Sequence, residues 1–487
     1  MFIYGHCLNV LDLTAAALLL FTLAAVIRRH LALRHIPGPF LASLTDIWLL
    51  CVMRFGDYRQ TTASLAARYP NSKLIRYGPH RVLFSDQHAI PLVYGTTKPF
   101  PKAASYNTVS PYIPGRGVVS TLLSSRDETQ ISAIKRHIAH VFSTTAVLEF
   151  EHHIDDSITQ LLAALASAGP QVNLQHDDTP LASRTAAVAD TSRGGQIRFA
   201  HWNNWLAAPY LESLVFKNPL LAHFARPELI TTIAAKRVVE RTEKGGAAFA
   251  HADLLDRFFQ AQQKDPELFS NPRIVALALA VVHGGTETTA HSLTILFYLL
   301  LRHPKSLARV QQEIGEATFS RFPPPYTEAA NQLPYLEACI KEAQRVQPLQ
   351  SGPTEREVPV GGVAIAGTFL PGGTVVSLNK AALQLDRSVF DPHDRYDVHE
   401  FLPERWLDGI DAAQASLMNR TNFAFSHGKR VCLGVHLAWA EMLKVTASLL
   451  MRFEVQLVDP GCRLEVKRGM TAIVTGRGLP VLLRERV

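Results

Sequence analysis

The sequence predicts a mainly α-helical chain with small β-sheets behind an N-terminal membrane helix. Three observations support this class: an apolar run near the N-terminus, helical periodicity from about Asp127 to Val346, and short strand-like pieces separated by glycine and proline. The strand-like pieces lie at Lys73–Ser85, Val358–Val376 and Phe453–Leu483.

The composition narrows the class of protein. Apolar residues make up 47% of the 487 residues and charged residues only 19%, which excludes a disordered chain and argues against a nucleic-acid partner. The net charge of +7 is spread along the chain and fits a membrane surface or an acidic partner. The cysteines are scattered without a CxxC pair, so neither a disulfide scaffold nor a zinc cluster is expected: Cys7, Cys51, Cys339, Cys432 and Cys462.

The apolar run Leu8–Ile27 has about the 20 residues that are needed to cross a bilayer. Arg28, Arg29 and Arg34 follow it, and no Lys or Arg precedes it. The positive-inside rule therefore predicts an external N-terminus and a cytosolic body, whereas a cleaved signal peptide carries its positive charge before the apolar run. The alternative is a buried or interfacial helix.

The segment FSHGKRVCLG, from Phe425 to Gly434, fits F-x-x-G-x-R-x-C-x-G at every fixed position. Gly428 and Gly434 allow tight backbone geometry and the close approach of a flat cofactor. Arg430 can neutralise a carboxylate of that cofactor, and Phe425 can shield the sulfur. A Cys432 thiolate on haem iron favours O–O cleavage. The alternative is a buried structural cysteine in a glycine-rich turn.

With this motif the chain resembles the cytochrome P-450 family of haem-thiolate monooxygenases over nearly its whole length. It is most similar to membrane-anchored fungal enzymes of secondary metabolism, of the pisatin demethylase type, which often open with a segment like 36–42 (IPGPFLA). The resemblance implies the cytochrome P-450 fold as one large domain over residues 31–487, behind an anchor at residues 1–30. It also implies haem b with the Cys432 thiolate as axial ligand.

A long apolar helix is predicted between Ser270-Asn271-Pro272 and His303-Pro304. Gly284 and Gly285 in its middle cost about 1 kcal/mol each relative to Ala, which suggests a functional reason for them. In the family this helix passes over the haem and is distorted there, so the resemblance places Gly285 at the cofactor. Glu287 and Thr288 fit the acid–alcohol pair that supplies two protons during oxygen activation.

Glu342 and Arg345 are three residues apart, so their charges share one helix face. A lone pair of this kind is usually an exposed ion pair. The resemblance implies instead a buried structural pair on the cysteine side of the haem, completed by Arg405.

The resemblance also implies cations for the haem propionates. Arg356 and Arg430 match two of them, and Lys135 or Arg136 matches the third. In that third helix the family usually has Trp or His four residues before an Arg, whereas this chain has Ile131 and Lys135. One contact is therefore expected to be lost and another weakened, because Lys lacks the arginine fork.

The resemblance implies a monooxygenase that uses O2, a lipophilic small molecule and electrons from a separate NADPH–cytochrome reductase. It places the protein in the endoplasmic reticulum membrane with a single span and a cytosolic catalytic domain. Two alternatives stay open: a haem-thiolate isomerase or dehydratase, which need not keep Glu287 and Thr288, and an inactive haem-binding paralogue. Gln175–Gln196 favours the latter, since the helix expected after Leu174 is not recognisable there.

Overall fold

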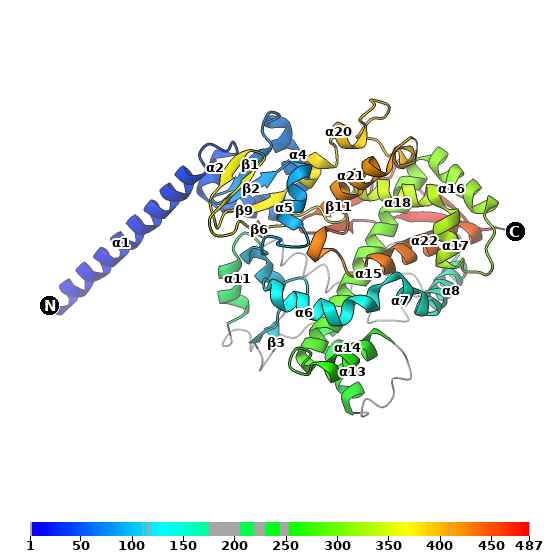
Figure 1. The fold of residues 1–487 in the computed structure, drawn as a ribbon, viewed down its shortest axis with the longest axis horizontal. Helices are drawn as coiled ribbons and strands as arrows, with labels where there is room; N and C mark the ends of the chain where they lie inside the picture. The colour runs from blue at the N-terminus through cyan, green and yellow to red at the C-terminus, as the bar shows by residue number, and fades with distance from the viewer. Residues whose placement is uncertain are drawn as a thin grey trace.

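A computed structural model describes residues 2–110, 112–113, 117–174, 205–218, 229–243, 253–407 and 409–486. The unusual segment Gln175–Gln196 lies outside the described residues, so the expectation of a missing helix there stays a prediction. Within the described residues the chain is mainly helical with small sheets, as the sequence predicts (Figure 1).

The α-helices cover most of the body. Their bounds are α1 (Phe2–Ala32), α2 (Phe40–Leu44), α3 (Ile47–Phe55), α4 (Tyr58–Arg68), α5 (Ile90–Tyr94), α6 (Glu128–Ile138), α7 (Thr144–Glu149), α8 (Glu151–Ser167), α11 (Pro209–Phe216), α13 (Leu229–Glu243), α14 (Leu254–Lys264), α15 (Asn271–Arg302), α16 (Pro304–Glu316), α17 (Tyr326–Gln332), α18 (Pro334–Val346), α19 (Lys380–Leu383), α20 (Arg387–Phe390), α21 (Ala412–Asn422) and α22 (Val435–Arg452). The helices from α6 to α18 fill the region in which the sequence shows helical periodicity.

Within the described ranges the strands form five small sheets. Their bounds are β1 (Leu74–Gly78), β2 (Arg81–Phe84), β3 (Tyr112–Ile113), β4 (Gly117–Val118), β5 (Gln171–Asn173), β6 (Arg356–Glu357), β7 (Val363–Ile365), β8 (Thr368–Leu370), β9 (Val375–Leu378), β10 (Phe453–Leu457), β11 (Glu465–Arg468), β12 (Ala472–Thr475) and β13 (Pro480–Glu485). The largest sheet has the order β1-β2-β9-β6, in which only β2 and β9 run parallel.

Helix α1 projects away from the body and contacts it only near its C-terminal end (Figure 1). The 21 residues Asp12–Ala32 are long and apolar enough to cross a membrane, a test of length and composition that a signal sequence also meets. Arg76 of β1, which is buried, donates hydrogen bonds to the carbonyl oxygens of Arg29 and His30. These bonds satisfy carbonyls at the end of α1, where no further helical turn donates N–H groups to them, and they join the helix to the sheet.

Helix α15 runs through the centre of the body (Figure 1). It spans 32 residues, with Pro272 in its first turn and His303 after its last residue, as predicted. Ser270 occupies the cap position, although its side chain makes no capping hydrogen bond. The largest apolar core packs α15 against α8, α16, α18 and α22, so this helix is held from several sides.

Candidate active site

The loop that carries Cys432 joins α21 to α22 and is built from left-handed backbone. Phe423, Ser426 and Gly428 have φ values of 57°, 66° and 61°. A Cβ on Gly428 would lie 2.0 Å from the carbonyl oxygen of Tyr94, so only glycine fits there. The amide of Cys432 donates to the Phe425 carbonyl at 2.9 Å, which closes the loop. The motif therefore gives this cysteine a fixed position at the start of α22.

The Cys432 side chain is exposed, yet protein atoms surround it closely enough that burial raises the pKa of its thiol. The Gly434 amide and the Lys135 ammonium both lower the pKa and favour the thiolate. A Cβ on Gly434 would meet no atom within 4 Å, so there is room beside the sulfur. Phe425, half-buried, has its ring centroid 6.4 Å from that of Trp439 and packs against the main core.

Helix α15 faces this loop, because Leu433 packs in the same apolar cluster as Leu277 and Val281. A Cβ on Gly284 or Gly285 would meet no atom within 4 Å, so these glycines leave the helix surface open. The helix is continuous through both glycines, and no interruption of the expected kind is present. The Thr288 hydroxyl donates to the Gly284 carbonyl one turn back, which occupies that oxygen inside the helix.

The acid of the expected pair, Glu287, is half-buried on α15, directly before Thr288. Its backbone carbonyl lies 2.7 Å from Nδ1 of His291, one turn further along the helix. Glu287 and Thr288 are therefore neighbours on α15, within the turn that follows the two open glycines.

Arg356 of β6 is buried and incompletely hydrogen-bonded. One terminal nitrogen donates to the Glu355 carbonyl at 2.9 Å, while Nε has no partner. Its guanidinium lies 5.0 Å from the ring centroid of Tyr94 and 5.7 Å from that of Tyr106. A buried guanidinium with an unused N–H fits an anionic group from a ligand.

The other expected cations bind protein groups. Arg430 donates to the Glu128 carboxylate through Nε at 2.9 Å and through a terminal nitrogen at 2.6 Å. Lys135 donates to the carbonyl oxygens of Lys429 and Val431. Arg136 is exposed on α6. Among these four residues, Arg356 combines burial with an unpartnered donor, and the assignment of the four to propionates stays a prediction.

Ile131, at the position where the family usually has Trp or His, is fully buried in the apolar cluster between α6, α14 and α15. It therefore serves packing and offers no hydrogen bond to a ligand. The loss of one propionate contact at this position stays a prediction.

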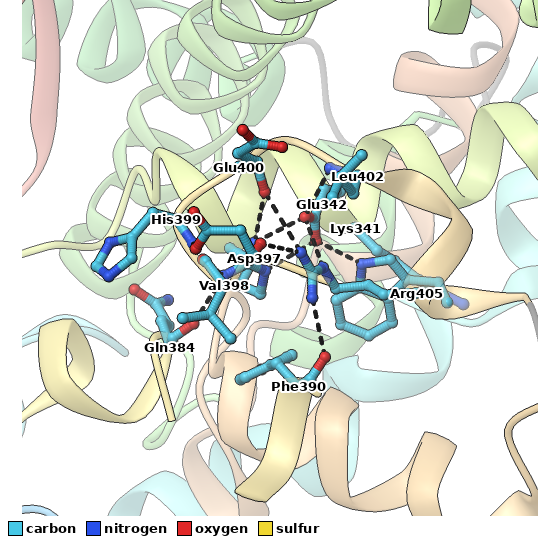
Figure 2. A network of polar contacts seen from close by, with 12 residues as sticks. Lys341, Glu342, Gln384, Phe390, Asp397, Val398, His399, Glu400, Leu402 and Arg405 are labelled. Atoms are coloured by element: carbon cyan, nitrogen blue, oxygen red, sulfur yellow. Dashed lines mark hydrogen bonds and ion pairs between the residues drawn. The ribbon is translucent and has the colours of Figure 1, made fainter. Parts of the chain in front are cut away.

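The expected structural network is fully buried (Figure 2). The Glu342 carboxylate accepts two hydrogen bonds from Arg345, at 2.8 and 2.7 Å, and one from Arg405 at 2.8 Å. The indole N–H of Trp406 donates to the same carboxylate at 2.8 Å. Burial alone would raise the pKa of Glu342, but the hydrogen bonds and charges of the two arginines lower it. The carboxylate is therefore held ionised.

Two further residues near the site are not among the sequence predictions. Lys102 is buried, donates to the Leu123 carbonyl and lies 4.3 Å from the Tyr106 ring centroid, beside Arg356. Burial and then the charge of Arg356 lower the pKa of Lys102. Glu441 of α22 is the second: burial raises its pKa to about 7, although the Thr289 side chain hydrogen-bonds it. In the sequence, the signal for Glu441 is that it is the single acidic residue of a largely apolar helical stretch.

Comparisons with known proteins agree with this geometry. The family model of cytochrome P-450 matches residues 184–480. Cytochrome P-450 monooxygenase cicH of Emericella nidulans is 32% identical over 460 residues, which cover 89% of this chain and 90% of the relative. Cytochrome P-450 monooxygenase cfoH of Aspergillus candidus is 28% identical over 488 residues, which cover 92% and 88%.

A third relative, cytochrome P-450 monooxygenase mpaDE of Penicillium roqueforti, is 28% identical over 490 residues, which cover 93% of this chain but 56% of the relative. The chain belongs to the cytochrome P-450 family. Within that family it is a monooxygenase, with fungal relatives at about this level of identity.

The residues present fit the haem group that this family implies. Cys432 offers one sulfur donor beside the uncrowded faces of Gly284, Gly285 and Gly434. Arg356 offers a buried cation with an idle N–H for a carboxylate. One sulfur donor, open glycine faces and a buried cation are the groups that would hold a flat, iron-containing cofactor with carboxylates.

Proposed function

We propose that the protein hydroxylates or otherwise oxidises a lipophilic small molecule with O2 and NADPH-derived electrons, in fungal secondary metabolism. The observation that supports this most is the Cys432 loop, in which left-handed backbone presents one cysteine next to open glycine faces. Haem b bound there would supply oxygen activation, a chemistry that side chains alone lack.

Named residues would hold the haem. Cys432 would bind the haem iron through its sulfur, and Phe425 and Gly428 would shape the loop around that sulfur. Arg356 would bind a propionate through its unpartnered donor. Glu342, Arg345 and Arg405 would hold the fold on the cysteine side without contacting substrate.

The protein would also supply protons. Thr288 carries a hydroxyl that donates to the Gly284 carbonyl, and this hydroxyl would hold a proton for transfer beside the open glycine face of α15. Glu287, the adjacent acid, would exchange protons with solvent. This pair favours oxygen activation over the isomerase or dehydratase alternative, which needs no proton delivery to oxygen.

Residues 1–30 would form the anchor and residues 31–487 the catalytic domain, in the endoplasmic reticulum membrane with the body in the cytosol. Exposed apolar side chains support this arrangement, because Phe40 (70%), Ile47 (63%) and Phe55 (81%) lie on α2 and α3, directly after α1. Such a patch suits a lipid surface. The electrons would come from a separate NADPH–cytochrome reductase, and the segment 36–42 supports a pisatin demethylase type.

Reconstitution tests the proposed reaction. The protein is co-expressed with a reductase and incubated with candidate terpenoid, polyketide and alkaloid substrates under ¹⁸O2. The expected product has gained one labelled oxygen atom and forms only with NADPH. The Thr288→Ala variant should form much less of this product. A product that forms without NADPH or without labelled oxygen would support the isomerase or dehydratase and contradict this proposal.

A further inference from the structure

Arg356 contacts two tyrosine rings that come from distant parts of the chain. Tyr94 is the last residue of α5, and Tyr106 belongs to the 3-10 helix Ala104–Val109. The guanidinium carbon of Arg356 lies 5.0 Å from the ring centroid of Tyr94 and 5.7 Å from that of Tyr106. Both tyrosines are buried. Because cation–π contacts are strongest away from water, the two rings restrict the positions that the guanidinium can take.

The hydrogen bonds of Arg356 leave one edge of its guanidinium unused. In the described part of the chain they all start at one terminal nitrogen, which donates to the Glu355 carbonyl at 2.9 Å and to the Tyr106 hydroxyl at 3.5 Å. Nε is buried and has no partner. Nε and the second terminal nitrogen form an edge with which arginine binds a carboxylate through two parallel hydrogen bonds. The chain therefore holds one end of the guanidinium and leaves a carboxylate-binding edge free.

The two acids that flank Arg356 in sequence are both paired with other arginines. Glu355 forms an ion pair with Arg81, and Glu357 forms one with Arg126. Successive residues of an extended chain point to opposite faces, so both carboxylates lie on the other face of the strand from the Arg356 side chain. The free edge of Arg356 thus faces away from the acids that could neutralise it.

The two rings are themselves held in place. The Tyr94 hydroxyl donates to the Thr354 carbonyl at 2.8 Å and accepts from the Leu378 amide at 3.0 Å. The Tyr106 ring centroid lies 4.3 Å from the ammonium nitrogen of Lys102, which donates in turn to a backbone carbonyl. Neither ring can therefore turn away from Arg356 without breaking other contacts.

We propose that Tyr94 and Tyr106 are positioning residues for Arg356: the two rings form an aromatic clamp that directs the free edge of the guanidinium toward a carboxylate of the bound cofactor. The inference rests on the proposed function, in which Arg356 binds a haem propionate. It adds a role for two residues that act on the propionate only through Arg356. Without the rings the guanidinium keeps its charge but takes several directions, so it holds the carboxylate less tightly.

A double-mutant cycle on the full-length holoprotein tests the clamp, with haem transfer to apomyoglobin as the measured rate. Tyr94→Leu and Tyr106→Leu each remove one ring, and each should speed haem release about tenfold, as the loss of a buried cation–π contact predicts. In the Arg356→Met background the same substitutions should change the rate by less than about twofold, because the group that they position is already gone. The propionate bending frequency in the resonance Raman spectrum should shift in both single variants.

Two control variants separate the clamp from general packing. Tyr94→Phe keeps the ring but loses the hydroxyl, so thermal stability should fall while haem release stays close to the wild-type rate. Tyr335→Leu removes a ring whose centroid lies 4.1 Å from the guanidinium carbon of Arg309, between α16 and α18. It should lower thermal stability without shifting the propionate frequency. If Tyr94→Leu retains too little haem, Tyr106→Leu alone completes the cycle.

The outcomes are distinguishable. If the ring substitutions speed haem release by the same factor with and without Arg356, the tyrosines only stabilise the fold around the haem and the inference is wrong. Unchanged release and an unchanged propionate frequency in both single variants would also overturn it. If Arg356→Met releases haem at the wild-type rate, or if the wild type gives no thiolate-type spectrum with CO, the proposed function fails first and the inference falls with it.

Discussion

Two buried arginines of this protein differ in how completely the chain satisfies them. Arg345 and Arg356 are 0% and 2% exposed. All five N–H groups of Arg345 have acceptors: the Glu342 carboxylate and the carbonyl oxygens of Gln384, Val398 and Glu400. Arg356 keeps an unpartnered Nε. The Arg345 site is therefore complete within the chain. Because an unpaired buried charge is costly, the Arg356 site needs an anion from outside the chain.

Breaking the complete site should have the largest effect. Glu342→Ala leaves Arg345 and Arg405 buried without their carboxylate, and we expect a loss of about 3–5 kcal/mol in the free energy of unfolding. Soluble yield and thermal unfolding of the holoprotein measure this loss. Glu240→Ala, which removes an exposed partner of Arg237, is the matched control and should change stability by under about 1 kcal/mol. Similar stabilities of the two variants would mean that the network is not structural.

Breaking the incomplete site should affect haem retention more than folding. Arg356→Met removes the cation but leaves no protein carboxylate unpaired, so haem transfer to apomyoglobin should be about ten- to hundredfold faster. Thermal unfolding should change far less than in Glu342→Ala. Arg356→Lys keeps the charge without the fork and should lie in between. Haem release at the wild-type rate from Arg356→Met would show that the idle donor does not face a propionate.

Glu441 gives a smaller, pH-dependent effect. Its pKa of about 7 in the folded chain lies above the ordinary value of 4.5, so the folded state keeps a proton that the unfolded state releases between these values. Stability from this group is therefore present at low pH and is lost as pH rises toward 7. Between pH 5 and pH 8, the free energy of unfolding of the wild type should fall by about 2–3 kcal/mol relative to that of Glu441→Gln. Denaturant unfolding at both pH values measures it, and parallel pH profiles would contradict the shift.

The sequence predicted the elements better than the contacts between them. The start and end of α15 followed from Pro272 and His303, because local signals set where a helix begins and stops. The helical region and the positions of the small sheets followed in the same way from periodicity.

Long-range pairing could not be predicted. Glu128 and Arg430 are 302 residues apart, and nothing local to either residue indicates the other. The resemblance assigns Arg430 and Lys135 to propionates, and the sequence gives no sign of the protein groups that both also bind in the structure. The shifted pKa values of Lys102 and Glu441 likewise depend on burial, which a single sequence indicates only through its pattern of apolar residues.

The most direct test of the central claim is the reduced CO difference spectrum of the full-length protein and of Cys432→Ala. The account predicts the red-shifted Soret band that gives the family its name for the wild type, and its loss for Cys432→Ala. A wild-type spectrum of the thiolate-free kind, or an unchanged band in Cys432→Ala, would contradict a haem thiolate at Cys432.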